Sequence, residues 1–278
     1  MCRWLAYSGS PIEVSRLIFD LDHSLIDQSL SARGDAATTN GDGFGIGWYD
    51  HCENPGLYKH TQPAWNDSNL RDLACHVRSH MFVAHVRAAT GTAIQQSNCH
   101  PFRYGRWIIV HNGRIRGFRR IKRQLAMAVP EELYPEIQGT TDSELMFYLA
   151  LGFGMEEDVL EGVSRMVGYV EEVGRAAGVD HPVQMTLGVA DGERLYAFRY
   201  STEHSSRTLF HSKSVSALRE LVPEEFHNQL EGFSEDARAI VSEPLTRLRD
   251  PWEEIPESTC VMVADGDVDP VPFQPHAP

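Results

Sequence analysis

Positive charge is scarce in this sequence of 278 residues. Its 25 lysines and arginines are outnumbered by 39 aspartates and glutamates, and the formal net charge is −14. A surface of that charge repels a phosphate backbone, and the one basic stretch, residues 114–123, is short. We therefore expect no nucleic-acid partner.

Long hydrophobic runs are also missing. No apolar segment reaches the ~18 residues of a membrane span, and the N-terminus lacks the basic and apolar regions of a signal peptide. We expect a cytoplasmic protein without membrane contact. Because 42% of the residues are hydrophobic, the chain can still bury a full core.

Cysteine is too sparse for a disulfide framework. The five cysteines are odd in number and scattered. Histidine and cysteine are dense between His76 and His111, but they do not combine the paired spacings of a structural zinc site. We expect no metal and no other cofactor.

The stretch Ile18–Leu25, IFDLDHSL, is similar to the signature of the haloacid dehalogenase phosphatases, in which two aspartates hold Mg²⁺. Those aspartates would be Asp20 and Asp22. However, the later acidic pair of that superfamily is missing, and His23 stands where it usually has glycine. A polar turn at the end of a helix is the better interpretation.

Hydrophobic periodicity predicts strands, then helices, then strands again. Alternating runs predict a first group of strands, and helical spacing predicts helices over 116–129, from the capping box at Thr141, and from Val159 to about Gly178. A hairpin with its turn at 191–193 and three further strands follow. The strands are expected at 2–7, 44–49, 81–86, 107–110, 183–190, 194–200, 207–211, 239–242 and 259–263.

This order predicts an α+β domain over residues 2–264. The proline-rich residues 265–278 are expected to form a loose tail.

Three stretches carry side chains suited to chemistry. Arg87 ends an apolar strand, where it can bind a carboxylate or form a surface ion pair. Asn112 and Gly113 offer two donors for an oxyanion, or simply form a tight turn. Asp142, at a helix start, can bind an ammonium or complement the helix dipole.

Read together, six short signals occur in the order seen in class II glutamine amidotransferases, and the chain resembles that family over most of its length. Segments 61–66, 98–102 and 117–122 most resemble the amidotransferase-like subunit of the fungal glutathione-degradation complex, with the ergothioneine-pathway γ-glutamyl hydrolases as near relatives. The six signals are Met1-Cys2, Asn40–Gly45, His85–Thr90, Asn98–Pro101, His111–Gly113 and Thr141–Glu144.

The resemblance implies an N-terminal-nucleophile hydrolase fold, an αββα sandwich of two stacked antiparallel sheets between helical layers. It also implies that Met1 is removed, because the side chain of Cys2 is small. The new terminus then supplies both the nucleophilic thiol and a free α-amine as base, whose pKa is about 7.7 to 8.0.

Further roles follow from the resemblance. It implies that Asn112 and the Gly113 N–H stabilise the oxyanion, and that Arg87 and Asp142 bind the α-carboxylate and α-ammonium of the glutamyl head. Thr90 and His100 match positions that line this pocket. Ala88 departs from the aminotransferase families, which often have tryptophan there, and this departure bears on leaving-group specificity.

The expected activity is hydrolysis of a γ-glutamyl amide, in glutamine or a γ-glutamyl conjugate, through a Cys2 thioester that releases glutamate. Two alternatives stay open: an ammonia-producing glutaminase subunit of a separate synthase, and a non-catalytic regulatory partner with the same fold. The expected partners are a small γ-glutamyl substrate and a peptidase or synthase subunit.

Overall fold

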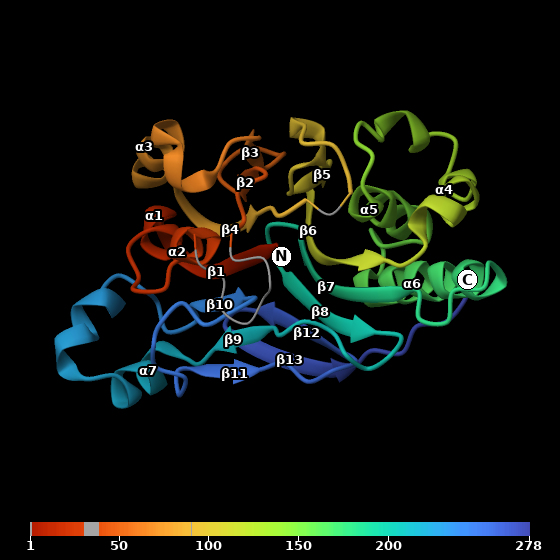
Figure 1. Cartoon of the computed structure of the whole chain (residues 1–278). Coiled ribbons are helices and arrows are strands. Elements are labelled where there is room, and N and C mark those ends of the chain that lie inside the picture. Colours follow the sequence, from red (N-terminus) through yellow and green to blue (C-terminus); the bar gives the residue numbers. More distant parts are fainter. Residues whose placement is uncertain (1, 31–38, 90) are drawn as a thin grey trace.

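Two antiparallel sheets stack face to face between helices (Figure 1). The computed structural model describes residues 2–30, 39–89 and 91–278. In the first sheet the strand order is β11-β9-β10-β1-β4-β2-β3, and in the second it is β13-β12-β8-β7-β6-β5. The first sheet contains β1 (Arg3–Glu13), β2 (Phe44–Trp48), β3 (Gly56–His60), β4 (Arg78–Val86), β9 (Phe210–Ser212), β10 (Arg238–Val241) and β11 (Trp252–Glu254). The second contains β5 (Phe102–Tyr104), β6 (Trp107–Ile115), β7 (Val183–Ala190), β8 (Leu195–Ser201), β12 (Thr259–Ala264) and β13 (Asp267–Pro272).

Helices cover the outer face of each sheet. One group packs on the first sheet and forms one hydrophobic core with it, and a second group does the same on the second sheet. The helices on the first sheet are α1 (Ser15–Ile18), α2 (Leu25–Leu30) and α3 (Ser68–His76), with α7 (Val215–Leu221) further along the chain. Those on the second sheet are α4 (Phe118–Met127), α5 (Asp142–Gly152) and α6 (Val159–Ala176). Short 3-10 turns are η1 (Ala64–Asn66), η2 (Gln96–Asn98), η3 (Tyr134–Glu136) and η4 (Glu224–Leu230).

Strand alternation explains why the sheets are buried on both sides. Along β1, Trp4 and Ala6 lie in the core between the sheets, whereas Leu5 and Tyr7 pack against the helices. Because successive side chains point to opposite faces, a strand in the middle of such a sandwich must be apolar at nearly every position. The expected α+β sandwich of two antiparallel sheets is confirmed.

The nine predicted strands are present, several with different ends, whereas β3, β5, β11 and β13 were not predicted. β6 continues past the predicted end at Val110 to Ile115, because β7 pairs with it as far as Ile115 opposite Val183. Asn112 and Gly113 therefore lie inside a paired strand, and the tight-turn interpretation of these two residues is wrong. The strand expected at 207–211 begins only at Phe210.

The predicted start of α5 is confirmed, with one variation. Thr141 is the N-cap, and its Oγ1 accepts a hydrogen bond of 3.2 Å from the Glu144 N–H. In a capping box, the carboxylate three residues after the N-cap accepts the backbone N–H of the N-cap residue. The Glu144 carboxylate has other partners. It accepts the N–H groups of Gln138 and Gly139 at 2.9 and 2.7 Å, which fixes the turn before the helix.

The expectation of a loose tail after residue 264 is wrong. Residues 267–272 form β13, which pairs with β12 from Thr259 opposite Pro272 to Ala264 opposite Asp267. Phe273 is fully buried against Phe198. The prolines are tolerated because β13 is an edge strand, where one row of backbone groups needs no partner.

None of the helices in the described part of the chain is both long and apolar enough to cross a membrane.

Candidate active site

Cys2 stands immediately before β1, and alternation from Trp4 directs its side chain toward the space between the sheets. The Sγ atom accepts a hydrogen bond from the Ala88 N–H at 3.4 Å and lies 3.5 Å from the Ala88 carbonyl oxygen. Burial raises the pKa of the Cys2 thiol, although the Ala88 N–H and the nearby Arg87 and Arg3 cations oppose that rise. A thiol held neutral in this way needs a base when it attacks.

Asn112 is brought to the same end of the intersheet space by strand pairing. Asn112 lies opposite Thr186 of β7, and Thr186 Oγ1 donates to the Asn112 carbonyl oxygen at 3.4 Å. That same Thr186 Oγ1 accepts from the indole N–H of Trp4 at 3.0 Å. Trp4 is two residues from Cys2, so these contacts join the strand of the thiol to the strand of Asn112.

Gly113 occupies a position where only glycine fits. A Cβ atom built there would lie 2.0 Å from the Gln184 carbonyl oxygen and 2.6 Å from His111 Nε2. The Asn112 amide and the backbone of Gly113 therefore stand on a strand held by β7, which suits a pre-organised pair of oxyanion donors.

The Arg87 guanidinium is almost completely buried, with 3% of the residue exposed, and its contacts are all to neutral oxygens. It donates to the carbonyl oxygen of Asp42 at 3.2 Å, to Thr92 Oγ1 at 2.7 Å and to the Ala93 carbonyl oxygen at 3.3 Å. Within residues 2–30, 39–89 and 91–278, no carboxylate oxygen lies within 4 Å of this guanidinium. A buried cation without a counter-charge is costly, and a ligand carboxylate would complete it.

Asp142 begins α5 next to the end of β6. Its carboxylate accepts the Ile115 N–H at 2.8 Å and the Ser143 N–H at 2.9 Å. Asn98 ties this region to the Arg87 region: its Nδ2 donates to the Ala93 carbonyl oxygen at 2.9 Å and its Oδ1 accepts the Thr140 N–H at 2.8 Å. The Asn98 side chain thus connects the segment that follows Arg87 to the segment that precedes Asp142.

Three histidines near the candidate residues are buried: His85, His100 and His111. The rings of His85 and His100 stack with centroids 4.2 Å apart, and His111 Nδ1 is 2.8 Å from Ser143 Oγ. Burial lowers the pKa of all three: that of His85 to about 3, and that of His100 well below its usual value. They are neutral and weakly basic, so none has the pKa of a general base at neutral pH.

His100 is thus packed among aromatic rings, with the Phe102 ring centroid 4.6 Å away at an interplanar angle of 65°. Thr90, the other residue expected to line the pocket, lies outside the described residues.

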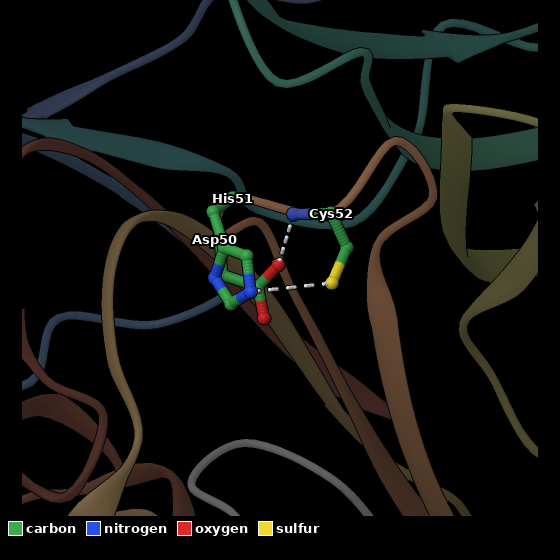
Figure 2. A group of neighbouring side chains, drawn as sticks. All are labelled: Asp50, His51 and Cys52. Atoms are coloured by element: carbon green, nitrogen blue, oxygen red, sulfur yellow. Dashed lines mark hydrogen bonds between the residues drawn. The ribbon is translucent and has the colours of Figure 1, made fainter.

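One group of side chains in the described ranges could offer three ligand atoms to a metal ion: Asp50, His51 and Cys52 (Figure 2). All three are exposed and consecutive in the connection after β2. Their turn is explained by the hydrogen bond of 2.7 Å from the Cys52 N–H to Asp50 Oδ1. Gly43 precedes β2, and its carbonyl oxygen accepts the Arg87 N–H. Because Asp50, His51 and Cys52 follow the opposite end of β2, they are separate from the candidate active site.

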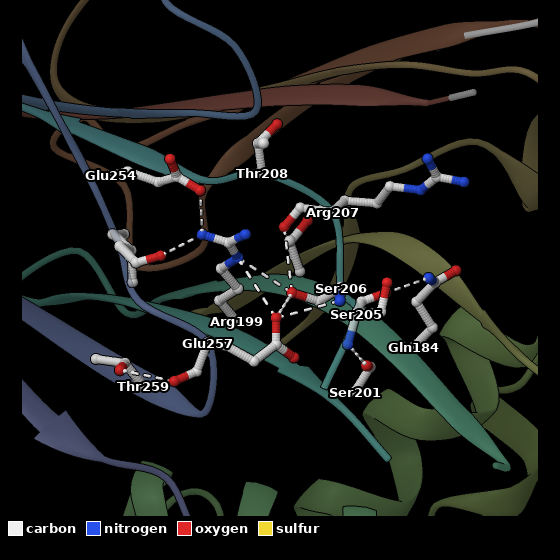
Figure 3. A network of polar contacts seen from close by, with 12 residues as sticks. Gln184, Arg199, Ser201, Ser205, Ser206, Arg207, Thr208, Glu254, Glu257 and Thr259 are labelled. Carbon is white, nitrogen blue, oxygen red and sulfur yellow. Dashed lines mark hydrogen bonds and ion pairs between the residues drawn. The ribbon is translucent and has the colours of Figure 1, made fainter. Parts of the chain in front are cut away.

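A polar network fixes the connection between β8 and β9 (Figure 3). Gln184 Nε2 donates to the Ser205 carbonyl oxygen at 2.7 Å, and the Ser205 N–H donates to Ser201 Oγ at 2.7 Å. Further along, Glu257 accepts the Ser206 N–H at 3.1 Å. Gln184 pairs with Arg114, so the network begins beside the end of β6 that carries Asn112 and Gly113.

The phosphatase-like aspartates do not reach this site. Asp20 and Asp22 are exposed in the turn that follows α1, as the polar-turn interpretation requires. An apolar cavity of about 360 Å³ lies near that turn, between α1, α7 and β10, and none of the candidate catalytic residues lines it.

Sequence reasoning missed several residues that position the site. Asp42 and Asn98 fall within stretches that suggested the family, but no pattern indicated that they hold the Arg87 loop. Glu243, which contacts Arg3, had no local signal, because its partner is 240 residues away.

Comparisons with known proteins identify the family of this chain. The family model for class-II glutamine amidotransferases matches residues 14–277. The "Probable glutamine amidotransferase DUG3" of Saccharomyces cerevisiae is 32% identical over 95% of this chain and 82% of its own length. A "Gamma-glutamyl-hercynylcysteine sulfoxide hydrolase" of Mycobacterium tuberculosis is 36% identical over 41% of this chain and 49% of its own.

Among solved structures, a glutamine aminotransferase class-II domain protein from Silicibacter pomeroyi superposes with a TM-score of 0.72 at 31% identity. The match covers 99% of this chain and 100% of that one.

Proposed function

This chain belongs to the class II glutamine amidotransferases, enzymes with the N-terminal-nucleophile hydrolase sandwich, and on that premise we propose that it hydrolyses a γ-glutamyl amide bond through a thioester on Cys2. The single observation that carries the substrate assignment is the buried Arg87 guanidinium, which has only neutral partners among the described residues. A planar guanidinium binds a carboxylate through two parallel hydrogen bonds, and the α-carboxylate of a glutamyl head is such a group.

In the proposed reaction, Cys2 Sγ attacks the γ-carbonyl carbon while its proton passes to the α-amine exposed by loss of Met1. The raised pKa of the buried thiol supports a separate base, and the lowered pKa values of the three histidines make them poor candidates for it. The oxyanion that forms accepts hydrogen bonds from the Asn112 amide and the Gly113 N–H.

The tetrahedral intermediate then collapses. The C–N bond breaks, the amine leaves with the proton held by the α-amine, and a thioester remains. Water adds to the thioester carbonyl, and the C–S bond breaks to give glutamate and free Cys2. Asp142 binds the α-ammonium throughout.

A substrate panel tests the proposal. Purified protein is incubated with glutamine, glutathione and a further γ-glutamyl amide, each also blocked at the α-amine or at the α-carboxylate, and released glutamate is measured. We expect free substrates to be cleaved and blocked ones to be poor. Glutamine cleavage that needs a separate synthase protein would instead favour the ammonia-producing subunit, and no cleavage of any compound would favour the non-catalytic partner.

The nucleophile is tested in the same assay. Cys2→Ala should abolish turnover, whereas Cys75→Ser, at an exposed cysteine, and Asp20→Asn should leave it unchanged. Intact-protein mass spectrometry should show loss of Met1 and, with substrate, a glutamyl adduct. An active enzyme that retains Met1 would exclude the α-amine as the base.

A further inference from the structure

The backbone carbonyl of Cys2 is held by the side chain of the next residue. Arg3 Nη1 donates to the Cys2 carbonyl oxygen at 3.0 Å, and the Arg3 side chain is only 6% exposed. Arg3 is also the first residue of β1, paired with Val86 of β4. The guanidinium therefore folds back over the end of the strand onto the residue that carries the thiol.

Arg3 is held in turn by Glu243. Arg3 Nε donates to Glu243 Oε1 at 2.7 Å, and Nη2 of the same guanidinium donates to the same oxygen. Strand pairing fixes the register, because the Ser242 N–H donates to the Trp4 carbonyl oxygen and the Trp4 N–H donates to Ser242 Oγ, both at 3.0 Å. The Glu243 carboxylate therefore lies beside Arg3 because of the pairing between these two segments of the first sheet.

The phosphatase-like stretch supports Glu243 from the other side. His23 Nε2 lies 3.4 Å from Glu243 Oε2, and Gln28 Nε2 donates to the Glu243 carbonyl oxygen at 3.3 Å and to the His23 carbonyl oxygen at 3.1 Å. Burial raises the pKa of the Glu243 carboxyl, but the contacts with His23 and Arg3 outweigh it and the net effect lowers that pKa. Glu243 is therefore ionised, and its charge balances that of Arg3.

Because the charges of Arg3 and Glu243 offset each other, we expect this pair to affect Cys2 mainly by fixing its position and only weakly through its electric field. Once Met1 is removed, Cys2 is joined to the fold by a single peptide bond, and chain ends fray unless they are tied down. The thiol and the α-amine are both attached to the Cys2 Cα atom, so their place in the site depends on where that atom lies. A hydrogen bond to the Cys2 carbonyl oxygen fixes the plane of the Cys2–Arg3 peptide and with it the position of Cα.

We propose that Arg3 and Glu243, supported by His23, are positioning residues: they hold the Cys2 carbonyl oxygen and so fix the position from which the Cys2 thiol and α-amine act. This inference rests on the proposed function, since it assigns Cys2 as the nucleophile. It gives a role to the sequence stretch around His23, which has no part in phosphoryl chemistry here.

The test measures kcat, KM and the alkylation rate of Cys2 by iodoacetamide, resolved by peptide mass spectrometry with the exposed Cys75 as internal reference. Arg3→Met should lower kcat about 10- to 100-fold, since small misplacements of a nucleophile cost that much, and KM should stay within about twofold. The ratio of Cys2 to Cys75 alkylation should fall as well. Glu243→Gln, which keeps the shape, should give the same pattern with a smaller loss.

A matched control lies on the same strand. Glu13, at the far end of β1, pairs with the exposed Arg78 at 2.7 Å, and Glu13→Gln should leave kcat and alkylation unchanged. The double variant of Arg3→Met with Glu243→Gln should resemble Arg3→Met alone, because the two side chains act as one unit. Multiplied losses in the double variant would contradict the proposal.

If Arg3→Met yields too little folded protein, Arg3→Lys and Glu243→Gln decide the question. An ammonium reaches either the Cys2 carbonyl or Glu243 but not both, so Arg3→Lys should have an intermediate kcat. Wild-type kcat and Cys2 alkylation in both variants, or a loss that appears only in KM, overturns the positioning role. A different outcome would overturn the proposed function alone: the wild-type enzyme shows no turnover, yet the variants still lower the ratio of Cys2 to Cys75 alkylation as expected.

Discussion

The indole N–H of Trp4 donates a hydrogen bond of 3.0 Å to Oγ1 of Thr186 and thereby joins the two sheets two residues from the candidate nucleophile. Space for the indole depends on Gly188, where an added Cβ would lie 3.0 Å from the Trp4 ring. Because Thr186 also contacts the backbone of Asn112, the pairing of strands in the sandwich connects the strand that follows Cys2 to the strand of the proposed oxyanion donor.

Asn112→Ala should lower kcat by about 10² to 10³ with little change in KM, because an oxyanion donor acts mainly as charge develops in the transition state. Steady-state kinetics with the best substrate of the panel measures both constants. Asn54→Ala, at an exposed asparagine, is the control and should behave as wild type. An increase in KM alone would move Asn112 from the reaction to substrate binding.

Arg87→Lys and Asp142→Asn should mainly raise KM, since the proposed roles of both groups are to hold the glutamyl head in the ground state and in the transition state alike. A lysine ammonium cannot reproduce the two-pronged contact with a carboxylate. The matched control is Arg78→Lys, at an exposed arginine at the start of β4. If Arg87→Lys lost kcat with KM unchanged, the carboxylate-binding role would be incorrect.

The buried histidines should make the folded protein sensitive to mild acid. Burial lowers the pKa of His85, His100 and His111 in the folded state, so below about pH 6.5 the unfolded chain binds more protons than the folded one. Stability therefore falls as pH falls from about 6.5 to 5, by up to about 1.4 kcal/mol per pH unit for each histidine. Urea unfolding at several pH values measures this slope.

His100→Phe tests the origin of that slope, because phenylalanine keeps the aromatic stack but cannot take up a proton. We expect the dependence between pH 5 and 6.5 to become about one third shallower. His76→Gln, at an exposed histidine, is the control and should leave the slope unchanged. An unaltered slope in His100→Phe would show that another group titrates in this range.

Phe273→Ala should cost about 3 to 5 kcal/mol of unfolding free energy, because the ring is buried with Phe198 at 5.1 Å and Tyr200 at 5.5 Å. Urea unfolding at pH 7 measures the loss. Val271→Ala, at a partly exposed residue of the neighbouring edge strand, should change the unfolding free energy by less than about 0.5 kcal/mol. A loss in Phe273→Ala as small as in the control would mean that the C-terminal segment contributes no packing.

Local patterns in the sequence determined most of the elements and the chemical character of the site. The alternation in β1 and the spacing of apolar residues in α6 predict a strand and a helix because each element buries its own apolar face. The cap at Thr141 is equally local, since its hydrogen bond spans three residues. The motifs around Cys2, Arg87 and Asn112 likewise needed no tertiary structure to suggest a resemblance to a family that cleaves amides.

Tertiary structure decided what depends on partners distant in the chain. Asn112 and Gly113 lie in a strand and not in a turn because β7 pairs with them. The tail is ordered because β12 accepts β13 and because Phe273 has a pocket to fill. Glu243 meets Arg3 only because β10 lies beside β1. A sequence records which groups are available, but sheet register brings those groups together, and register is a property of the whole fold.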